Sequence, residues 1–282
     1  MHRLLTGPLT VEQVTVPIRD LPSGLEGCRI VQLSDFHFDG LRCSPWLLKA
    51  VVHKTEELAP DLIALTGDFV TKDPSPIHPL ASTLEALSSR FKVIAVLGNH
   101  DDKSLLGRKI ITEALTQSGI TVLWNKIAYP LGEDFPVVGL ADLRSQEFAP
   151  DNLLSHLPPD LPRLLLSHNP DSAALLESWR VDLQLSGHTH GGQIVLPWIG
   201  PLPALTQRAQ FALLSPLGKV IPYFNPNCAK VVRHWEWASG LHRVGQNWLY
   251  VNRGLGTYPP GRLFCPPELT EITLMRRTEE PG

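Results

Sequence analysis

The residues with the clearest capacity for chemistry are two histidines in residues 185–192, which read L-S-G-H-T-H-G-G. His188 and His190 stand two positions apart, so they cannot share a helix face, where neighbours fall three or four residues apart. In a glycine-flanked turn they can converge, because glycine accepts backbone conformations that other residues avoid. Imidazole is a good ligand for zinc, iron and nickel. This turn is therefore a candidate metal site.

Further polar residues of the same kinds lie upstream in four short motifs. These motifs are D-x-H at Asp35 and His37, G-D at Asp68, G-N-H-D at Asn99, His100 and Asp101, and the single His168. Each motif alone has an ordinary explanation. Asp35 and Asp68 could cap the ends of strands, and residues 98–101 could form a simple turn. The lone His168 could cap a helix.

Each of these motifs follows a short apolar segment that the sequence predicts to be a strand. The five strands cover residues 29–34, 61–66, 91–97, 163–167 and 181–186. Helical spacing is found at residues 44–58, 80–89, 104–118 and 170–179. Ligand sites in open α/β sheets lie beyond the carboxyl ends of the strands. We therefore expect the motifs to gather at one edge.

The rest of the chain is richer in strands. Residues 11–18 alternate as an edge strand that tolerates Pro17, residues 120–140 have strand-like periodicity, and further strands are predicted at 230–237, 247–251 and 269–275. This order favours an α/β fold with mixed sheets. No stretch has the composition of a linker, so we expect one domain over residues 1–282, with the motif-bearing part at about 27–276.

The types of the candidate ligands restrict the metal. Aspartate, histidine and one asparagine, without a thiolate, favour manganese, iron, zinc or cobalt over calcium and exclude a structural cysteine–zinc site. Seven ligands are too many for one tetrahedral zinc and suit two metals that share a carboxylate. Two metals roughly 3.5–4 Å apart can clamp both the attacking and the leaving oxygen of an in-line phosphoryl displacement.

Composition excludes several classes of protein. The formal net charge of −3 lacks the basic excess of a general nucleic-acid binder. The four cysteines are widely spaced and indicate reduced thiols rather than a disulfide framework. The first thirty residues have no long apolar run, so we expect no signal peptide and no N-terminal anchor, and a cytoplasmic location.

Residues 194–224 are apolar and rich in proline, with only two charges and five prolines. The prolines exclude one continuous membrane-spanning helix. The segment is either a packed connection or a lid beside the metals. In the second case we expect Trp198, Leu202 and Phe211 to line an acyl-chain groove or to rest on a membrane surface.

In this order, D-x-H, G-D, G-N-H-D, a lone histidine and G-H-T-H resemble the signature of the calcineurin-like metallophosphoesterases. The later segments V-N-R-G-L-G at 251–256 and R-L-F-C-P-P-E at 262–268 are similar to the small bacterial branch typified by YkuE and YaeI. The resemblance runs from about residue 27 to 275. Many members of that branch carry an N-terminal membrane segment, which this sequence does not show.

The resemblance implies a four-layer αββα sandwich with two mixed β-sheets and two divalent metal ions, manganese being favoured. One metal would take Asp35, His37, Asp68 and His190, and the other would take Asp68, Asn99, His168 and His188. A hydroxide bridging the metals would be the nucleophile. His100 would meet the phosphate or protonate the leaving group, Asp101 would orient it, and Arg253 would touch the substrate.

The implied activity is hydrolysis of phosphodiester or pyrophosphate bonds in a phosphoester substrate. A nucleotide-linked lipid such as UDP-2,3-diacylglucosamine, used in lipid A synthesis, is one candidate, with peripheral contact to the inner face of the membrane. General or cyclic-nucleotide phosphodiesterase activity is the alternative. A catalytically silent metal-binding scaffold is the alternative from another class.

Overall fold

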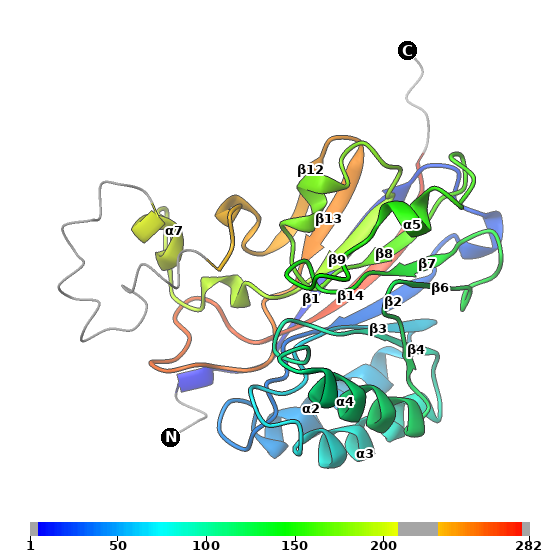
Figure 1. Ribbon diagram of the computed structural model, residues 1–282. Coiled ribbons are helices and arrows are strands. Elements are labelled where there is room, and N and C mark those ends of the chain that lie inside the picture. Colours follow the sequence, from blue (N-terminus) through cyan, green and yellow to red (C-terminus); the bar gives the residue numbers. More distant parts are fainter. Residues whose placement is uncertain (1–4, 208–230, 278–282) are drawn as a thin grey trace.

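In the computed structural model, which describes residues 5–207 and 231–277, two six-stranded sheets pack face to face (Figure 1). The first sheet has the order β1-β14-β2-β3-β4-β5, formed by Thr10–Ile18, Glu268–Arg276, Arg29–Leu33, Leu62–Thr66, Val93–Val96 and Thr121–Val122. The second has the order β12-β13-β9-β8-β7-β6, formed by Gly240–Val244, Asn247–Val251, Leu183–Ser186, Leu164–Leu166, Val137–Gly139 and Lys126–Ala128.

Both sheets are mixed. β2, β3, β4 and β5 are parallel to one another, and β14 pairs with β2 in the antiparallel direction and with β1 in the parallel direction. In the second sheet β13, β9, β8 and β7 are parallel, and the edge strands β12 and β6 are antiparallel to their neighbours. The carboxyl ends of the central strands therefore lie at one end of each sheet. The predicted α/β class with two mixed sheets is confirmed.

Helices cover the outer faces. α2 (Pro45–Leu58), α3 (Ile77–Ser88) and α4 (Leu105–Gln117) lie on the first sheet (Figure 1). In the described ranges, the second sheet carries the short α5 (Asp151–Leu154) and α6 (Ser172–Leu175). α2 begins where Ser44 accepts a hydrogen bond from the Leu47 amide, with Pro45 in the first turn. Ser104 caps α4 in the same way.

Apolar layers on both faces of the first sheet result from the alternation of side chains along the strands. Val31, Ile63 and Ala95 face the helices, while Ile30, Leu62 and Ile94 face the second sheet. The layer between the sheets also contains Leu164, Leu166, Leu183 and Leu185 from the other sheet. Because successive strand residues point to opposite faces, one short strand contributes to two cores.

Two predicted elements differ from the structure. Residues 231–237 form no strand but a 3-10 helix, η5 (Trp235–Trp237). The backbone amides of Arg233 and His234 bind the Asp171 carboxylate instead of a neighbouring strand. The helix expected at 170–179 is reduced to α6, because the chain turns at the buried Leu176 to enter β9.

The proline-rich segment is described as far as residue 207. It forms a hairpin of β10 (Val195–Leu196) and β11 (Gly200–Pro201), followed by α7 (Leu202–Gln207). Trp198 at the hairpin tip is fully exposed, but Leu202 is only 7% exposed. The expectation that Leu202 lines an open groove is therefore wrong, and Phe211 lies outside the described residues. None of the helices in the described ranges is long and apolar enough to cross a membrane.

Candidate metal centre

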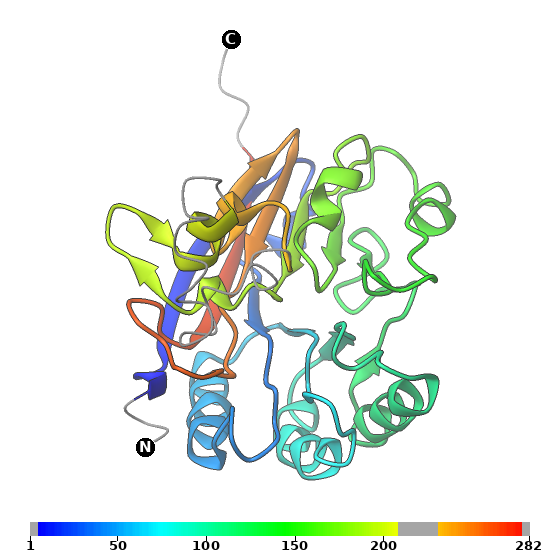
Figure 2. The same cartoon turned by 60° about the vertical axis from the view of Figure 1, so that its left-hand side comes forward.

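Loops from both sheets meet at the carboxyl ends of β2, β3, β4, β8 and β9 (Figure 2). Within the first sheet, the amide of Asp35 donates to the carbonyl of Gly67 at 2.9 Å, and in the second sheet Gly187 donates to His168 at 2.9 Å. The two sheets are joined by the buried side chain of Gln32, whose Nε2 donates to the carbonyl of Ser186 at 2.9 Å. The motifs therefore lie on loops that hold one another in place.

Asp35, His37 and His190 form the first group of potential ligands. The Nε2 atoms of the two histidines lie 3.1 Å apart, and Asp35 Oδ1 is 3.3 Å from His190 Nε2. All three residues are at most 8% exposed. Three donor atoms with lone pairs thus converge on one buried point.

Asp68, His168 and His188 form the second group. His168 Nε2 lies 3.1 Å from His188 Nδ1 and 3.2 Å from Asp68 Oδ2. The same Asp68 oxygen is 3.5 Å from His37 Nε2 of the first group. One carboxylate oxygen therefore faces both groups.

The outer nitrogens of three histidines contact backbone carbonyls. His168 Nδ1 lies 2.7 Å from Thr66 O, His190 Nδ1 3.1 Å from Gly256 O, and His188 Nε2 3.3 Å from Val231 O. A carbonyl can only accept, so each of these nitrogens carries a proton. In the neutral ring the inner nitrogen then has a free lone pair, the arrangement that orients histidine as a metal ligand.

In each of the two aspartates, one carboxylate oxygen is bound by the protein and the other faces the site. Asp35 Oδ2 accepts from the Ser34 hydroxyl at 2.6 Å and the His188 amide at 2.9 Å. Asp68 Oδ1 accepts from the His100 amide at 2.8 Å. The outer oxygens are thus held by the protein, and the inner oxygens face the histidine nitrogens.

Electrostatics keep both carboxylates ionised. Burial alone would raise the pKa of Asp35, but His190 lowers it below the usual range. His168 does the same for the pKa of Asp68. Burial would lower the pKa of His168, but the Asp68 carboxylate raises it to about 10. In the metal-free protein, His168 therefore holds a proton that a metal ion would displace.

Two other imidazoles are held neutral. Burial lowers the pKa of His188 to about 3, and it lowers the pKa of His37 well below its ordinary value. Neutral imidazole and ionised carboxylate are the forms that bind divalent metals.

The backbone at the site is strained. Asp35, His37, Asp68, His188 and His190 all have positive φ angles, between 43° and 71°. Residues with side chains rarely adopt this region, and such strain persists where the surroundings over-determine it. Five of the seven predicted ligands share this feature.

Glycines allow the loops to approach each other. A Cβ atom on Gly98 would lie 2.2 Å from Asp68 Oδ1, and one on Gly187 would lie 2.3 Å from Asp35 Oδ2. No side chain fits at these distances. The glycines of the G-N-H-D and G-H-T-H motifs therefore leave room for the carboxylates.

Asn99 completes the predicted ligand set. Its Oδ1 is buried and has no hydrogen-bond partner among the residues that the structure describes. A buried polar atom without a partner is costly and needs an explanation. An oxygen ligand beside carboxylates and imidazoles fits a pair of divalent ions, so the residues present are suited to the two metals that the sequence predicts.

His100 lies beside the two groups rather than in them. Its ring packs edge-on against His37, with 4.8 Å between ring centroids, and its Nδ1 is 2.6 Å from the carbonyl of Thr71. Unlike the buried ligands, His100 and Asn99 are half-buried. Solvent therefore reaches the site on their side in the part of the chain that the structure describes.

The predicted role of Asp101 is wrong. Its carboxylate does not hold the His100 ring but accepts backbone N–H groups from Phe69, Val70 and Gly98. It therefore ties the G-D loop to the G-N-H-D loop. Burial raises the pKa of Asp101 to about 8, with a further contribution from the nearby Asp68. Asp101 is a positioning residue for the ligands on both loops.

Arg253 is placed at the edge of the site with its charge already compensated. Its Nε lies 2.5 Å from Glu268 Oε2, and it also pairs with Glu12. Its side chain passes beside Gly191 of the histidine turn, where an added Cβ would be 2.8 Å from Arg253 Cγ. These contacts support the turn, and the contact of Arg253 with substrate stays a prediction.

Three residues at the site were missed by sequence reasoning. Tyr258 Oη is 3.1 Å from His37 Nδ1, Arg42 stacks on the Tyr258 ring at 4.4 Å, and Lys103 Nζ is 2.8 Å from His100 Nδ1. Tyr258 comes from the loop after β13, far from the motifs in sequence. Only the position of Lys103, two residues after G-N-H-D, offered a signal.

Comparisons with known proteins agree with this geometry. A family model described as Calcineurin-like phosphoesterase matches residues 28–192. The chain is 34% identical to the uncharacterized metallophosphoesterase YkuE of Bacillus subtilis over 260 residues, which cover 90% of this chain and 81% of that protein. It is 32% identical to phosphodiesterase YaeI of Escherichia coli, covering 88% and 82% of the two chains.

A third relative has a more specific name. The UDP-2,3-diacylglucosamine pyrophosphatase LpxG of Chlamydia muridarum is 31% identical over 305 residues, which cover 91% of this chain and 85% of that protein. The family match spans all five motifs, from Asp35 to His190, and the relatives extend over nearly the whole chain. The protein therefore belongs to the calcineurin-like phosphoesterases, a family of metal-dependent hydrolases.

Proposed function

We propose that the protein hydrolyses phosphodiester or pyrophosphate bonds with two divalent metal ions. The observation that carries this proposal is Asp68 Oδ2, which lies 3.5 Å from His37 Nε2 and 3.2 Å from His168 Nε2 and so faces both ligand groups. Asp35, His37, Asp68 and His190 would hold one ion, and Asp68, Asn99, His168 and His188 the other. When bound, such a pair activates water and stabilises the attacking and leaving oxygens of an in-line displacement.

His100 is the proposed proton donor to the leaving group. Its Nδ1 is engaged by the Thr71 carbonyl, which leaves Nε2 for the substrate. The ring is half-buried on the open side of the site, where a leaving group must depart. General acid catalysis by a positioned histidine contributes roughly 10²–10⁴-fold.

For the natural substrate we favour a pyrophosphate bond in a nucleotide-linked lipid. The name of the LpxG relative supports this choice. Exposed apolar side chains near the site support it as well: Trp198 at the β10–β11 tip is fully exposed and Phe264 is 68% exposed. The two segments lie side by side (Figure 1, Figure 2), because the Val195 amide donates to the carbonyl of Leu263 at 3.0 Å. Such a patch suits peripheral contact with a membrane or an acyl chain.

The second candidate is a general or cyclic-nucleotide phosphodiesterase, which the name of the YaeI relative favours. Both candidates use the same metal centre and differ only in what lies beyond the scissile phosphate.

The test is to strip the protein of metal and reload it with manganese, iron, zinc or cobalt. We expect two equivalents by elemental analysis, and metal-dependent hydrolysis of bis(p-nitrophenyl) phosphate, highest with manganese. UDP-2,3-diacylglucosamine and a cyclic nucleotide then separate the two candidates. Two bound metals without turnover of any of these substrates would instead indicate a metal-binding scaffold.

A second experiment tests whether the apolar patch of Trp198 and Phe264 takes part in substrate recognition. Trp198→Ser and Phe264→Ser should reduce turnover of an acylated nucleotide sugar more than that of its unacylated form. Trp46→Ser is the control, because Trp46 is a half-exposed tryptophan on α2. Equal effects on both substrates would remove the patch from substrate recognition.

A further inference from the structure

Three cationic residues stand on the loops around His100 and are not among the predicted metal ligands. Lys103 Nζ lies 2.8 Å from His100 Nδ1 and 2.6 Å from the carbonyl of Thr71. Lys72 follows Thr71 directly in the chain. Arg42 stacks on the ring of Tyr258, whose hydroxyl contacts His37. We call Arg42, Lys72 and Lys103 the basic rim.

The rim is built into the loop structure rather than scattered on the surface. Thr71 Oγ1 donates to Asp39 Oδ2 at 3.0 Å, and the same carboxylate pairs with Arg42. The Thr71 carbonyl contacts both Lys103 and His100. A continuous series of contacts therefore connects Arg42 to His100 through Asp39 and Thr71.

Positive charge is in excess at the rim. In the described ranges, neither Lys72 nor Lys103 forms an ion pair with a carboxylate, whereas Arg42 pairs with Asp39. Lysines elsewhere do have partners, such as Lys54 with Glu57 at 2.8 Å. Burial lowers the pKa of Lys103 most, the Asp68 and Asp101 carboxylates raise it, and Lys72 and Arg42 lower it, so these like charges act on one another. An anion placed between them would relieve that repulsion.

The position of the rim indicates which part of a substrate would meet it. Asn99 and His100 are the half-buried members of the site, so a substrate enters on their side. A phosphoryl group bound between the two ligand groups must extend past His100. The next group of the substrate then lies against Lys103 and its neighbours.

We propose that Arg42, Lys72 and Lys103 bind the non-scissile phosphate of a diphosphate substrate, and thereby select pyrophosphate bonds over simple diesters. This inference rests on the proposed function and specifies its substrate class. Water adds to the scissile phosphorus, and the bridging P–O bond breaks with its electron pair going to the second phosphate. That phosphate carries the negative charge that the rim neutralises, and lysine and arginine are suited to it as charged donors.

The test compares two substrates on the manganese-loaded protein. We expect Lys72→Ala combined with Lys103→Ala to lower kcat/KM for UDP-N-acetylglucosamine roughly 10–100-fold, the usual worth of a charged hydrogen bond, and to lower it less for bis(p-nitrophenyl) phosphate. Lys103→Arg should restore part of the loss. Lys109→Ala is the control, because this α4 lysine pairs with Glu113 and lies outside the site.

A binding measurement avoids turnover altogether. Calorimetry should show that the wild type binds methylenediphosphonate more tightly than methylphosphonate, and that the double variant loses this preference. Equal losses on both substrates, or an unchanged preference for the diphosphonate, would overturn the inference. A wild type that cleaves the diester but not the diphosphate would also overturn it and leave the proposed function intact, whereas failure to cleave either would reject the proposed function.

Discussion

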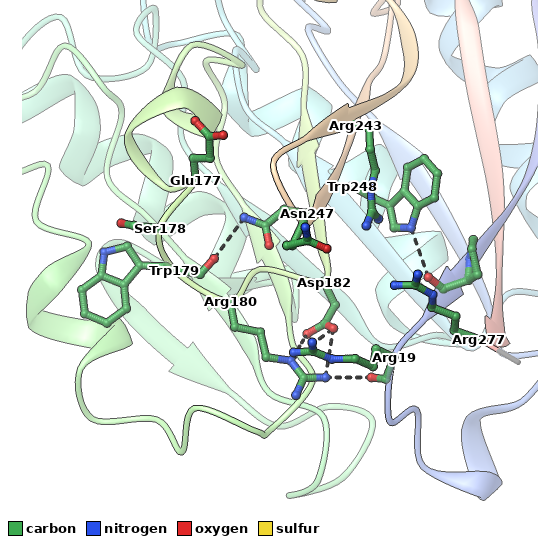
Figure 3. Close-up of a pocket in the computed structure, with 12 residues that line it drawn as sticks. Arg19, Glu177, Ser178, Trp179, Arg180, Asp182, Arg243, Asn247, Trp248 and Arg277 are labelled. Carbon is green, nitrogen blue, oxygen red and sulfur yellow. Dashed lines mark hydrogen bonds and ion pairs between the residues drawn. The ribbon is translucent and has the colours of Figure 1, made fainter. Parts of the chain in front are cut away.

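Polar residues at the two ends of β9 have different consequences. At its carboxyl end, Ser186 leads into His188 and His190, whose inner nitrogens face other nitrogens and carboxylate oxygens across the site. At its amino end, Asp182 binds Arg180 at 3.0 Å and the Arg163 amide at 2.9 Å, beside a pocket of about 210 Å³ (Figure 3). Arg180 is bound further by Asp20 at 3.1 Å.

The two ends differ in whether their polar atoms have hydrogen-bond partners within the fold. In the pocket of Figure 3, Asn247 accepts from the Val181 amide and donates to the Trp179 carbonyl, so its polar atoms are used within the fold. At the candidate metal centre, Asn99 Oδ1 has no partner within residues 5–207 and 231–277, and the backbone of five predicted ligands is strained. Charges paired with opposite charges stabilise structure, whereas converging lone pairs on strained loops are suited to an ion.

The largest effect is expected from Asp68→Asn. Loss of the shared oxygen charge should release both metals and reduce hydrolysis by roughly 10⁴-fold or more, since a metal pair contributes several kcal/mol to the transition state. The metal-free variant should be less stable than the metal-free wild type, because the buried ion pair between Asp68 and His168 is lost. Elemental analysis and thermal unfolding measure both effects. Retention of two equivalents of metal would contradict the shared-ligand assignment.

His100→Ala should retain both metals and lose about 10²–10⁴-fold in turnover. The loss should be smaller for esters with good leaving groups, which need little protonation. A series of aryl phosphodiesters with different leaving-group pKa values tests this. If the variant matched the wild type on poor leaving groups, His100 would have no role in proton transfer.

Asp182→Ala should lower stability without affecting metal binding or turnover. Removing one partner of a buried ion pair leaves Arg180 with only the exposed Asp20 as a carboxylate partner and leaves the Arg163 amide without its acceptor, which should lower the free energy of unfolding by about 3 kcal/mol. Metal content and turnover at permissive temperature should not change. Denaturant unfolding gives the loss, and a change in metal stoichiometry would show that the two ends of the strand are coupled.

The smallest expected effect is the pH dependence of metal affinity. The pKa of His168 is raised to about 10 in the metal-free protein, so at pH 7 this residue is protonated and must lose its proton to bind metal. Metal binding should release about one proton from this residue, and the affinity should rise about tenfold per pH unit until pH approaches 10. Calorimetry in buffers of different ionisation enthalpy counts the protons. A His168→Asn variant should lack this release.

Much of the architecture was predictable because the pattern that encodes it is local. The apolar runs at 29–34, 61–66 and 91–97 are strands in the structure, and Ser44 and Ser104 cap the helices that follow. The strand expected at 230–237 was wrong because its backbone donors are used by Asp171, a residue far away in sequence. Periodicity does not reveal such a competitor.

For the site, the sequence by itself determined which residue types stand at the ends of the strands, because a motif such as G-N-H-D needs only its own few residues. Tertiary structure decided which of their atoms point inward. Tyr258 and His37 are 221 positions apart, and the backbone carbonyls that orient His168 and His190 come from Thr66 and Gly256. Asp101 was assigned to the wrong partner because the amides that it binds belong to a neighbouring loop. Contacts of this kind arise only when two sheets pack, so no local pattern contains them.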